Sequence, residues 1–499
     1  MSNTENKKST YLMLAVLFVG AFVSFLNNSL LNVALPSIMV DLEVDYSTVQ
    51  WLATGYMLVS GVLIPASAFL IRRFSNRTLY ITSMVIFTIG TAMAAFAPNF
   101  GFLLTGRMVQ AAGSSVMGPL LMNVMLVAFP REKRGAAMGI FGLVMITAPA
   151  IGPTLSGFIV EYYDWRYLFI MILPLAVISL LLAIWKLGNV MATDKSITID
   201  FSSLILSTFG FGGLLYGVST ASSDGWDDPI VLTTLIVGLV ALVVFVTRQL
   251  KLDEPLLDLR VYKYPMFALA SIIAVVNSVA MFSGMILTPA YVQNVRGISP
   301  LDSGLMMLPG AIIMGIMSPI TGKLFDKFGP RVLAIIGLLI TAVSTYELST
   351  LQIDSSYLYI ISIYSTRMLG MSMVMMPIMT NGLNQLPTRL NPHGTAVNNT
   401  AQQVAGAIGT AVLVSIMNYV TTKEGESLMA NVDPATLTEQ TMGLLGQQAL
   451  LAGIQYSFLV ALGMNIIALV LAFFLKRVDV SPTALQKLEE ENQVKPTTK

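Results

Sequence analysis

The sequence predicts an all-α integral membrane protein with fourteen transmembrane helices in a 6 + 2 + 6 arrangement. Composition is the first reason. Of the 499 residues, 55% are hydrophobic and only 11% are charged, whereas a soluble domain carries about 25% charged residues. The other two reasons are the long apolar segments and a pattern of motifs that occurs twice along the chain.

Each predicted transmembrane helix is a run of roughly 20 or more mostly apolar residues, the length that crosses a bilayer. The first run follows Lys7 and Lys8, as in a signal peptide, but it is too long for one, so we interpret it as an uncleaved anchor. The runs are 11–35, 47–71, 79–97, 101–128, 136–160, 166–187, 201–221, 229–248, 266–291, 302–322, 331–350, 356–384, 397–419 and 449–475.

The distribution of lysine and arginine orients these helices, because cytoplasmic loops carry an excess of both. With a cytoplasmic N-terminus and alternating helices, most of the 28 lysines and arginines fall in inside loops and tails. The loop with Asp41, Glu43 and Asp45 then falls outside. We therefore expect a multi-pass protein of the cytoplasmic membrane with both termini in the cytoplasm.

Residue counts disfavour several classes of function. The net charge of +1 gives no basic field for nucleic acid. The absence of cysteine excludes disulfides and thiol catalysis, and a single histidine argues against a metal site. The sequence has no nucleotide-binding loop and no motif of a catalytic triad. We therefore expect neither an enzyme nor a cofactor.

Four features occur twice in the same order, which indicates an internal repeat. A proline is expected to end the first helix of each copy, at Pro36 and Pro289, and a small residue, Ala68 or Gly322, opens a basic turn. An arginine inside a span and a run of small residues follow in each copy: Arg107 and 152–157, then Arg367 and 406–409. Parallel six-helix repeats are typical of transporters. The expected units are an N-terminal bundle (1–190), a two-helix insertion (191–255), a C-terminal bundle (256–478) and a cytoplasmic tail (479–499).

Five short motifs carry a resemblance to a known family. They are Asn-Val-Ala-Leu-Pro at 32–36, Arg-Met-Val-Gln at 107–110, Ala-Pro-Ala-Ile-Gly-Pro at 148–153, Asp-Trp-Arg at 164–166 and Glu-Pro-Leu-Leu-Asp-Leu-Arg at 254–260. With them the chain resembles the fourteen-span drug:proton antiporters of the major facilitator superfamily. The resemblance implies the major facilitator fold and multidrug efflux, the export of amphiphilic drugs or antibiotics by proton antiport and alternating access. It implies small amphiphilic substrates, protons and membrane lipids as partners, and a monomer.

The chain departs from the subgroup's pattern at three places. Asn27 stands where the subgroup has an acid in the first helix, and Gln402 stands where many relatives have arginine. In the first cytoplasmic turn, Arg72 and Ser75 replace the family's aspartate and glycine. Proton coupling therefore needs a group other than the first-helix acid.

The candidates for proton coupling are Arg107, which the resemblance places beside the cavity, and the acids Glu347, Asp302 and Glu161. An apolar setting raises the pKa of a carboxyl group, and Glu347 has the most apolar neighbours in the sequence. The alternative for the acids is a solvated position at the membrane interface, and for Arg107 a structural bond to helix carbonyls. For Arg367 both interpretations stay open.

The expected substrate cavity is lined by polar residues of the first spans and by methionines of the twelfth: Asn27, Asn28, Tyr56, Gln110, Met371 and Met375. The alternatives are hydrogen bonds between helices for the asparagines, and packing for the methionines, which form a helical stripe with Met368 and Met379. Few acids inside the spans disfavour dicationic substrates and favour neutral or zwitterionic amphiphiles.

Two further groups of residues are expected to move during transport. The resemblance implies an interface helix with Pro149, Gly152, Pro153 and Gly157, and a cytoplasmic gate at Asp326, Lys327 and Arg331. We interpret Arg72 and Arg73 as membrane anchors, His393 as a turn residue of a cytoplasmic loop, and 420–448 as a lid or a surface helix. The alternative functions are export of an endogenous metabolite or lipid, and facilitated transport without proton coupling.

Overall fold

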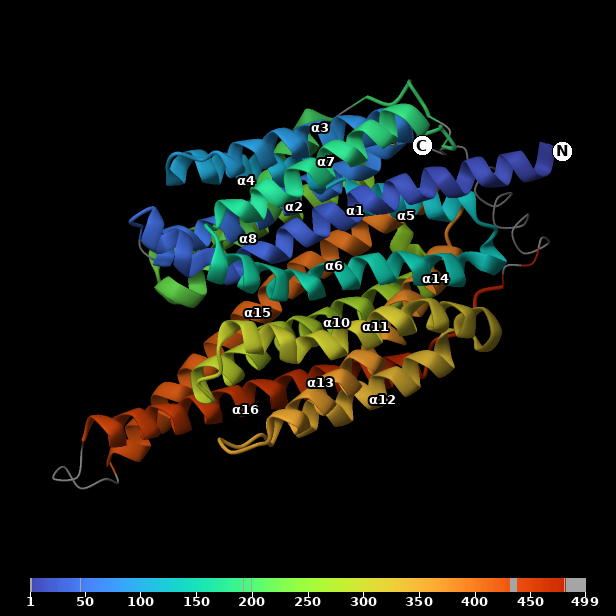
Figure 1. Ribbon diagram of the computed structural model, residues 1–499. Coiled ribbons are helices and arrows are strands. Elements are labelled where there is room, and N and C mark those ends of the chain that lie inside the picture. The colour runs from blue at the N-terminus through green and yellow to red at the C-terminus, as the bar shows by residue number, and fades with distance from the viewer. Residues whose placement is uncertain are drawn as a thin grey trace.

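The computed structural model describes residues 2–44, 46–191, 193–198, 200–430, 438–479 and 481. Its helices run roughly side by side and form two bundles, which lie one above the other in Figure 1. Fourteen stretches of helix are long and apolar enough to cross a membrane. The predicted class and number of spans are therefore confirmed.

The first bundle contains seven helices for six spans, because the fourth span is divided. Its members are α1 (Ser2–Asp41), α2 (Tyr46–Arg73), α3 (Asn76–Ala95), α4 (Phe100–Ser114), α5 (Met117–Ala128), α6 (Arg134–Tyr162) and α7 (Arg166–Lys186), with a 3-10 turn η1 (Arg131–Lys133) before α6.

The second bundle has the same order of helices. Its members are α10 (Pro265–Ala290), α11 (Pro300–Phe328), α12 (Pro330–Ser349), α13 (Tyr357–Ser372), α14 (Met375–Asn384), α15 (Asn391–Ala430) and α16 (Glu439–Ala472), with the short turns η2 (Leu259–Lys263), η3 (Tyr291–Val295) and η4 (Thr388–Leu390).

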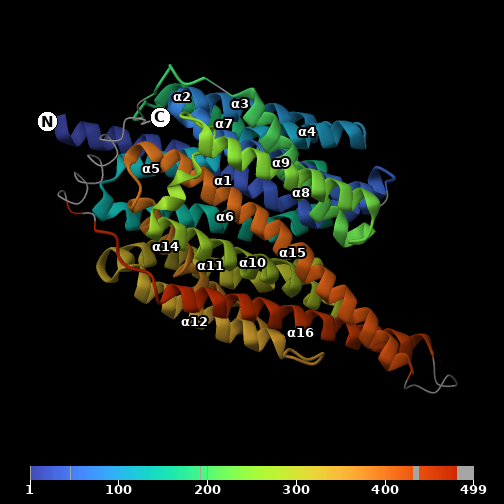
Figure 2. The same ribbon diagram turned by 180° about the vertical axis from the view of Figure 1, so that it is seen from behind.

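A pair of helices, α8 (Phe201–Asp224) and α9 (Pro229–Lys251), connects the bundles in the sequence. The two helices approach closely at glycines, since a Cβ on Gly213 would lie 3.0 Å from the Thr234 carbonyl oxygen. Small residues allow such close packing of helices in a bilayer. Seen from behind, α8 and α9 lie beside α2 and α15, and α8 packs against both (Figure 2).

Both divided spans break at the same place relative to a proline. Ser115 and Val116 separate α4 from α5, and Met373 and Val374 separate α13 from α14. Pro119 and Pro377 follow four residues after the start of each break. A proline lacks the N–H that would bond the carbonyl four residues earlier, and its ring crowds that carbonyl. The expected spans at 101–128 and 356–384 are therefore each one candidate span made of two helices.

Two other expectations are corrected. Pro36 does not end the first helix, because α1 continues to Asp41. Pro289 lies next to the last residue of α10, and the π-helix η3 continues the same span to Val295. Residues 420–430 extend α15 and residues 439–448 begin α16, so they are not a separate surface helix, and a role as a lid stays a prediction. Residues 431–437 and most of the predicted tail lie outside the described residues.

One end of the molecule carries the start of α1 and the end of α16 (Figure 1). We call it the terminal end; it comprises the helix ends and loops at 72–76, 128–134, 186–191, 193–198, 200, 251–265, 322–331, 384–393 and 472–479. The opposite end, which we call the far end, comprises 41–44, 46, 96–100, 161–166, 224–229, 295–302 and 347–357.

Candidate functional site

The first bundle has a polar layer at its centre, built around Arg107 of α4. Its Nη1 donates to Gln110 Oε1 at 2.9 Å, and Gln110 Nε2 donates to Thr91 Oγ1 at 2.8 Å and to Asn27 Oδ1 at 3.3 Å. The guanidinium lies 4.4 Å from the centre of the Tyr56 ring. Helices α1, α2, α3 and α4 therefore contribute to one hydrogen-bonded and stacked group.

This layer holds a positive charge without a carboxylate among the contacts that the structure gives it. Arg107 is fully buried, and its Nε has no hydrogen-bond partner. The Asn27 amide nitrogen, at the position where the subgroup has an acid, is likewise buried without a partner. A buried guanidinium costs several kcal/mol unless polar groups or water compensate it. The neutral amide of Gln110 and the aromatic face of Tyr56 supply that compensation here.

Arg367 of α13 is the counterpart of Arg107 in the second bundle. It is also fully buried, with its Nε 3.3 Å from Thr345 Oγ1 and its Nη2 bonded to the Ala280 carbonyl and to Ser283 Oγ. Gly284 permits this, because a Cβ there would lie 1.7 Å from Arg367 Nη1. The bond to a helix carbonyl matches the structural interpretation of this arginine.

The three candidate acids lie at the far end, away from the polar layer. Glu347 is half-buried in the last turn of α12, where Tyr359 donates to its Oε2 at 2.6 Å. Asp302 is exposed in the first turn of α11, and Glu161 is exposed in the last turn of α6. The structure brings none of these three to Arg107, and their part in proton coupling stays a prediction.

The expected cavity residues fall into separate environments. Asn27, Tyr56 and Gln110 join Arg107, whereas the Asn28 side chain is exposed. Met371 packs with Met314 and Tyr364 in the second bundle. Met375, beyond the break in the span, packs instead against a second core cluster, which residues of both bundles form, so the methionine stripe is divided.

Helices α6 and α11 form the main contact between the bundles. A Cβ on Gly139 would lie 2.6 Å from the Ser318 carbonyl, and Ser318 Oγ donates to the Gly139 carbonyl at 2.8 Å. Toward the far end, a Cβ on Gly157 would lie 3.4 Å from Leu301. Gly152 faces the other way, toward Ser29 of α1. Pro149 and Pro153 lie half-buried inside the same helix α6.

At the terminal end, side chains of each bundle bond to helix ends of the other. Asp326 of α11 accepts the Ala136 N–H in the first turn of α6 at 3.1 Å. Arg131 donates to the Asn384 carbonyl at the end of α14 at 2.7 Å, and Arg134 donates to the Asn384 side chain at 3.2 Å. Acids are favourable at helix N-termini and cations at helix C-termini. Of the expected gate, Asp326 makes a contact across the bundles, while the Lys327 and Arg331 side chains are exposed.

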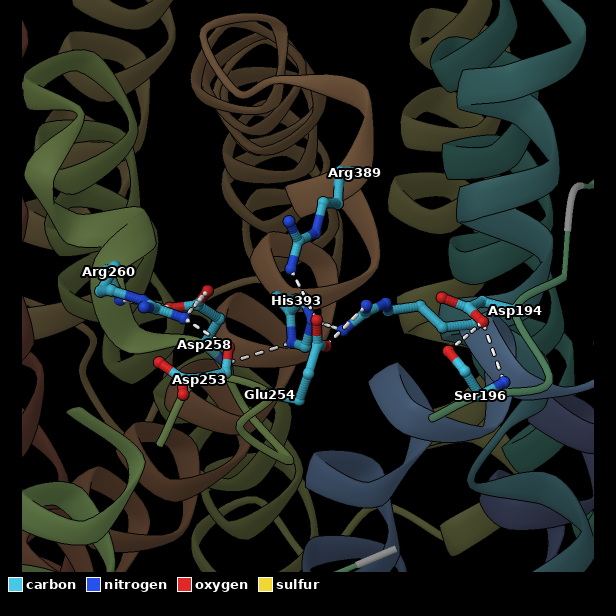
Figure 3. Close-up of polar contacts among 9 residues, drawn as sticks. Asp194, Ser196, Asp253, Glu254, Asp258, Arg260, Arg389 and His393 are labelled. Carbon is cyan, nitrogen blue, oxygen red and sulfur yellow. Dashed lines mark hydrogen bonds and ion pairs between the residues drawn. The ribbon is translucent and has the colours of Figure 1, made fainter. Parts of the chain in front are cut away.

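A second group of charged residues at the terminal end joins α2 to α15 and to the segment that follows the insertion. Arg72 donates to Glu254 Oε2 at 2.8 Å and lies 3.0 Å from His393 Nε2. Arg389 donates to the other oxygen of Glu254 at 2.8 Å, and the Asp258 N–H points at His393 Nδ1 at 3.1 Å (Figure 3). We call these residues the histidine cluster: Arg72, Glu254, Asp258, Arg260, Arg389 and His393.

The histidine cluster corrects two interpretations of the sequence. His393 is not a loop residue, because it lies in the first turn of α15 and is 1% exposed. Arg72 does not serve only as an anchor at the membrane interface, since its side chain is 13% exposed and bonds to Glu254. Burial raises the pKa of Asp258, but the hydrogen bond and charge of Arg260 outweigh it, so this pKa lies below its ordinary value.

Comparisons with known proteins agree with this architecture. The family model of the Major Facilitator Superfamily matches residues 17–410. The chain is 53% identical over 418 residues to the uncharacterized MFS-type transporter YhcA of Bacillus subtilis, covering 84% of this chain and 78% of that one. It is 45% identical over 484 residues to the lincomycin resistance protein LmrB of the same organism, covering 96% and 98%.

A solved structure with the same fold is the proton:xylose symporter XylE bound to 6-bromo-6-deoxy-D-glucose. The TM-score is 0.64 at 14% sequence identity, and the match covers 97% of this chain and 99% of that one. At such low identity the likeness concerns the fold alone. Family model, relatives and fold agree: this chain belongs to the major facilitator superfamily and is a membrane transporter, not an enzyme.

Proposed function

We propose that the chain exports neutral or zwitterionic amphiphilic drugs or antibiotics across the cytoplasmic membrane. Proton antiport drives this export, and alternating access is its mechanism. One observation carries this proposal. At the terminal end the bundles are joined by single charged side chains on helix ends, such as Asp326 on α6 and Arg131 on α14. Such bonds break and re-form when two rigid bundles rock against each other, as alternating access requires.

The relatives support the class of substrate. A relative of nearly the same length is named for resistance to lincomycin, and export is one route to resistance. The central layer of this chain supports the exclusion of dications, because the contacts of Arg107 include an amide and an aromatic ring and no carboxylate. A second positive charge brought to this layer would be repelled.

The proposed orientation places the terminal end in the cytoplasm and the far end outside. The terminal end carries Arg72, Arg131, Lys133, Arg134 and Lys327 among its helix ends, as the positive-inside rule requires of cytoplasmic loops. We further propose that 1–190 and 256–478 are the two moving units, that 191–255 is an insertion beside them, and that the transporter works as a monomer.

A facilitator without proton coupling is the second candidate. It is favoured by Asn27, which leaves the polar layer without the acid that the subgroup has in this position. The two candidates differ in one measurable property, because only the antiporter moves its substrate against a concentration gradient when a pH gradient is imposed.

The test is uptake of radiolabelled lincomycin, and of a lipophilic fluorescent dye, into proteoliposomes with an imposed pH gradient. Nigericin, which collapses the gradient, is the control. We expect gradient-driven accumulation in the wild type, about 10²-fold slower uptake in Arg107→Gln, and partial activity in Arg107→Lys, which keeps the charge. Downhill flux without any effect of the gradient would establish the facilitator, and no flux of either probe would refute export of amphiphiles.

A further inference from the structure

The histidine cluster presents an imidazole to two groups that can only donate hydrogen bonds. His393 Nε2 lies 3.0 Å from an Arg72 guanidinium nitrogen, and Nδ1 lies 3.1 Å from the backbone nitrogen of Asp258. A guanidinium and a backbone N–H have no acceptor atom. A neutral imidazole has one acceptor nitrogen and satisfies one of these contacts, whereas an imidazolium has none and satisfies neither.

The charges around the imidazole also oppose a proton. Arg72 on α2, Arg260 on η2 and Arg389 before α15 surround it, together with the carboxylates Asp258 and Glu254. Both carboxylates are already used: Asp258 pairs with Arg260, and Glu254 bridges Arg72 and Arg389. His393 also lies in the first turn of α15, where the helix dipole disfavours a cation.

The start of α6 in the first bundle corresponds to the start of α15 and has no histidine. Arg134-Gly135-Ala136-Ala137 opens α6, and His393-Gly394-Thr395-Ala396 opens α15. At the α6 site, the acid Asp326 approaches the N–H groups of the helix, which is electrostatically favourable. At the α15 site, the cation Arg72 approaches instead, and the imidazole can accept from it when Nε2 carries no proton.

We infer that His393 makes closure of the terminal end sensitive to protons, because the neutral imidazole holds Arg72 against α15 and the imidazolium releases it. The proton comes from water at the terminal end and binds to the ring nitrogen that accepts from Arg72. Arg72 then loses its direct contact with α15 and is held to that side only through Glu254, which Arg389 also binds, so the closed terminal end is weakened. The inference rests on the alternating access proposed above and adds a proton-binding switch to it.

The size of the effect follows from linkage. An imidazole in water titrates near pH 6.5. If only the open state of the terminal end binds this proton, lowering the pH from about 7.5 to about 5.5 raises the ratio of open to closed molecules about tenfold.

The test measures distances between spin labels in nanodiscs at the two pH values. The chain has no cysteine, so introduced cysteines are labelled without background. One pair, Lys186→Cys with Lys323→Cys, spans the bundles at the terminal end, and a second, Phe96→Cys with Leu358→Cys, spans them at the far end; all four side chains are exposed. We expect the terminal-end pair to move apart at low pH and the far-end pair to approach.

Three variants make the test specific. His393→Gln keeps an acceptor for Arg72 but binds no proton, so the terminal end should stay closed at both pH values. His393→Lys carries a permanent charge and should be open at both. Arg72→Gln removes the cation that the His393 imidazolium is proposed to repel, so this variant should reduce the pH response. It tests the inference independently if the His393 variants do not fold. Asp326→Asn is the control, since Asp326 is a titratable residue outside the histidine cluster that also bonds across the bundles, and it should keep the response.

Two results would overturn the inference. A full pH response in His393→Gln would exclude His393, and loss of the response in Asp326→Asn alone would assign the switch to that acid. The distances need no substrate, so they separate this inference from the proposed function. A pH-dependent closure without lincomycin or dye transport would refute the function and leave the switch standing.

Discussion

Arg72 and Asp326 hold corresponding positions in the two repeats, and each contacts the first turn of a helix in the other bundle. Each lies four residues after the small residue that opens its turn, Ala68 or Gly322. Asp326 bonds directly to a backbone N–H of α6, while Arg72 reaches α15 through His393. The same fold position therefore carries opposite charges, and the acid alone is matched to the helix dipole.

Removing the Asp326 carboxylate should weaken closure of the terminal end. Asp326→Ala leaves the first turn of α6 without this acceptor, and the loss of a helix-capping side chain costs about 1 kcal/mol. We expect the ratio of closed to open molecules, measured with the terminal-end label pair, to fall about fivefold. Lys327→Gln is the matched control, because the exposed Lys327 side chain contacts its neighbour Phe328. An equal effect in both variants would contradict the role of Asp326.

A methyl group on Gly322 should separate α6 from α11. Its Cβ would lie 2.2 Å from the Gly135 carbonyl oxygen, and a backbone atom cannot turn aside as a side chain can. We expect Gly322→Ala to lower stability by about 1–3 kcal/mol and to abolish closure, measured by thermal unfolding in detergent and by label distances. Gly463→Ala in α16 meets nothing within 4 Å and should be neutral or slightly stabilising. Equal melting temperatures for the two variants would refute this packing argument.

An ion pair between the start of α8 and the end of α9 predicts a pH-dependent stability. Arg248 donates to Asp200 at 2.8 Å and lowers the pKa of this acid to about 2, from an ordinary value of 3.8. A lowered folded-state pKa gives stability that is present above about pH 4 and is lost as the pH falls toward about 2.

The variant Asp200→Asn should therefore melt below the wild type at neutral pH. The pair is partly exposed, so we expect a difference of about 0.5–1 kcal/mol that shrinks below about pH 4. Asp227→Asn, at an exposed position between α8 and α9, is the control. A difference that is unchanged down to about pH 2 would show that it does not come from this carboxylate.

The fold could be predicted from the sequence because its signals are local. Apolar runs of sufficient length give the spans, and repeated motifs give two bundles. The divided spans were missed although Pro119 and Pro377 are visible in the sequence, because proline is also tolerated within intact transmembrane helices. α6, for example, keeps Pro149 and Pro153 in its interior.

The histidine cluster could not be predicted, because its members are far apart in the chain. Arg72 and His393 are 321 residues apart, and Arg72 and Glu254 are 182 apart. The sequence marks 254–260 as a distinctive string and Arg72 as a departure from the family pattern. However, nothing in the sequence indicates that Arg72 contacts the 254–260 string. The single histidine looked like a turn residue because proline and glycine flank it, although both also suit a helix start packed against a neighbour.

The polar layer predicts the effect of restoring the acid that this chain lacks in the first helix. In Asn27→Asp the carboxylate would replace an amide whose nitrogen has no partner and whose oxygen accepts from Gln110 at 3.3 Å. It would lie beside the group that bonds Arg107, so it would gain an attractive charge that the wild type does not have. We expect the pH dependence of transport to differ from that of the wild type, since the layer then contains a carboxyl group that can bind or release a proton. Asn27→Ala removes the same acceptor without adding a titratable group and should lower transport equally at every pH. If Asn27→Asp and Asn27→Ala gave the same pH profile, the layer would not couple charge to transport, and proton coupling would have to come from elsewhere in the chain.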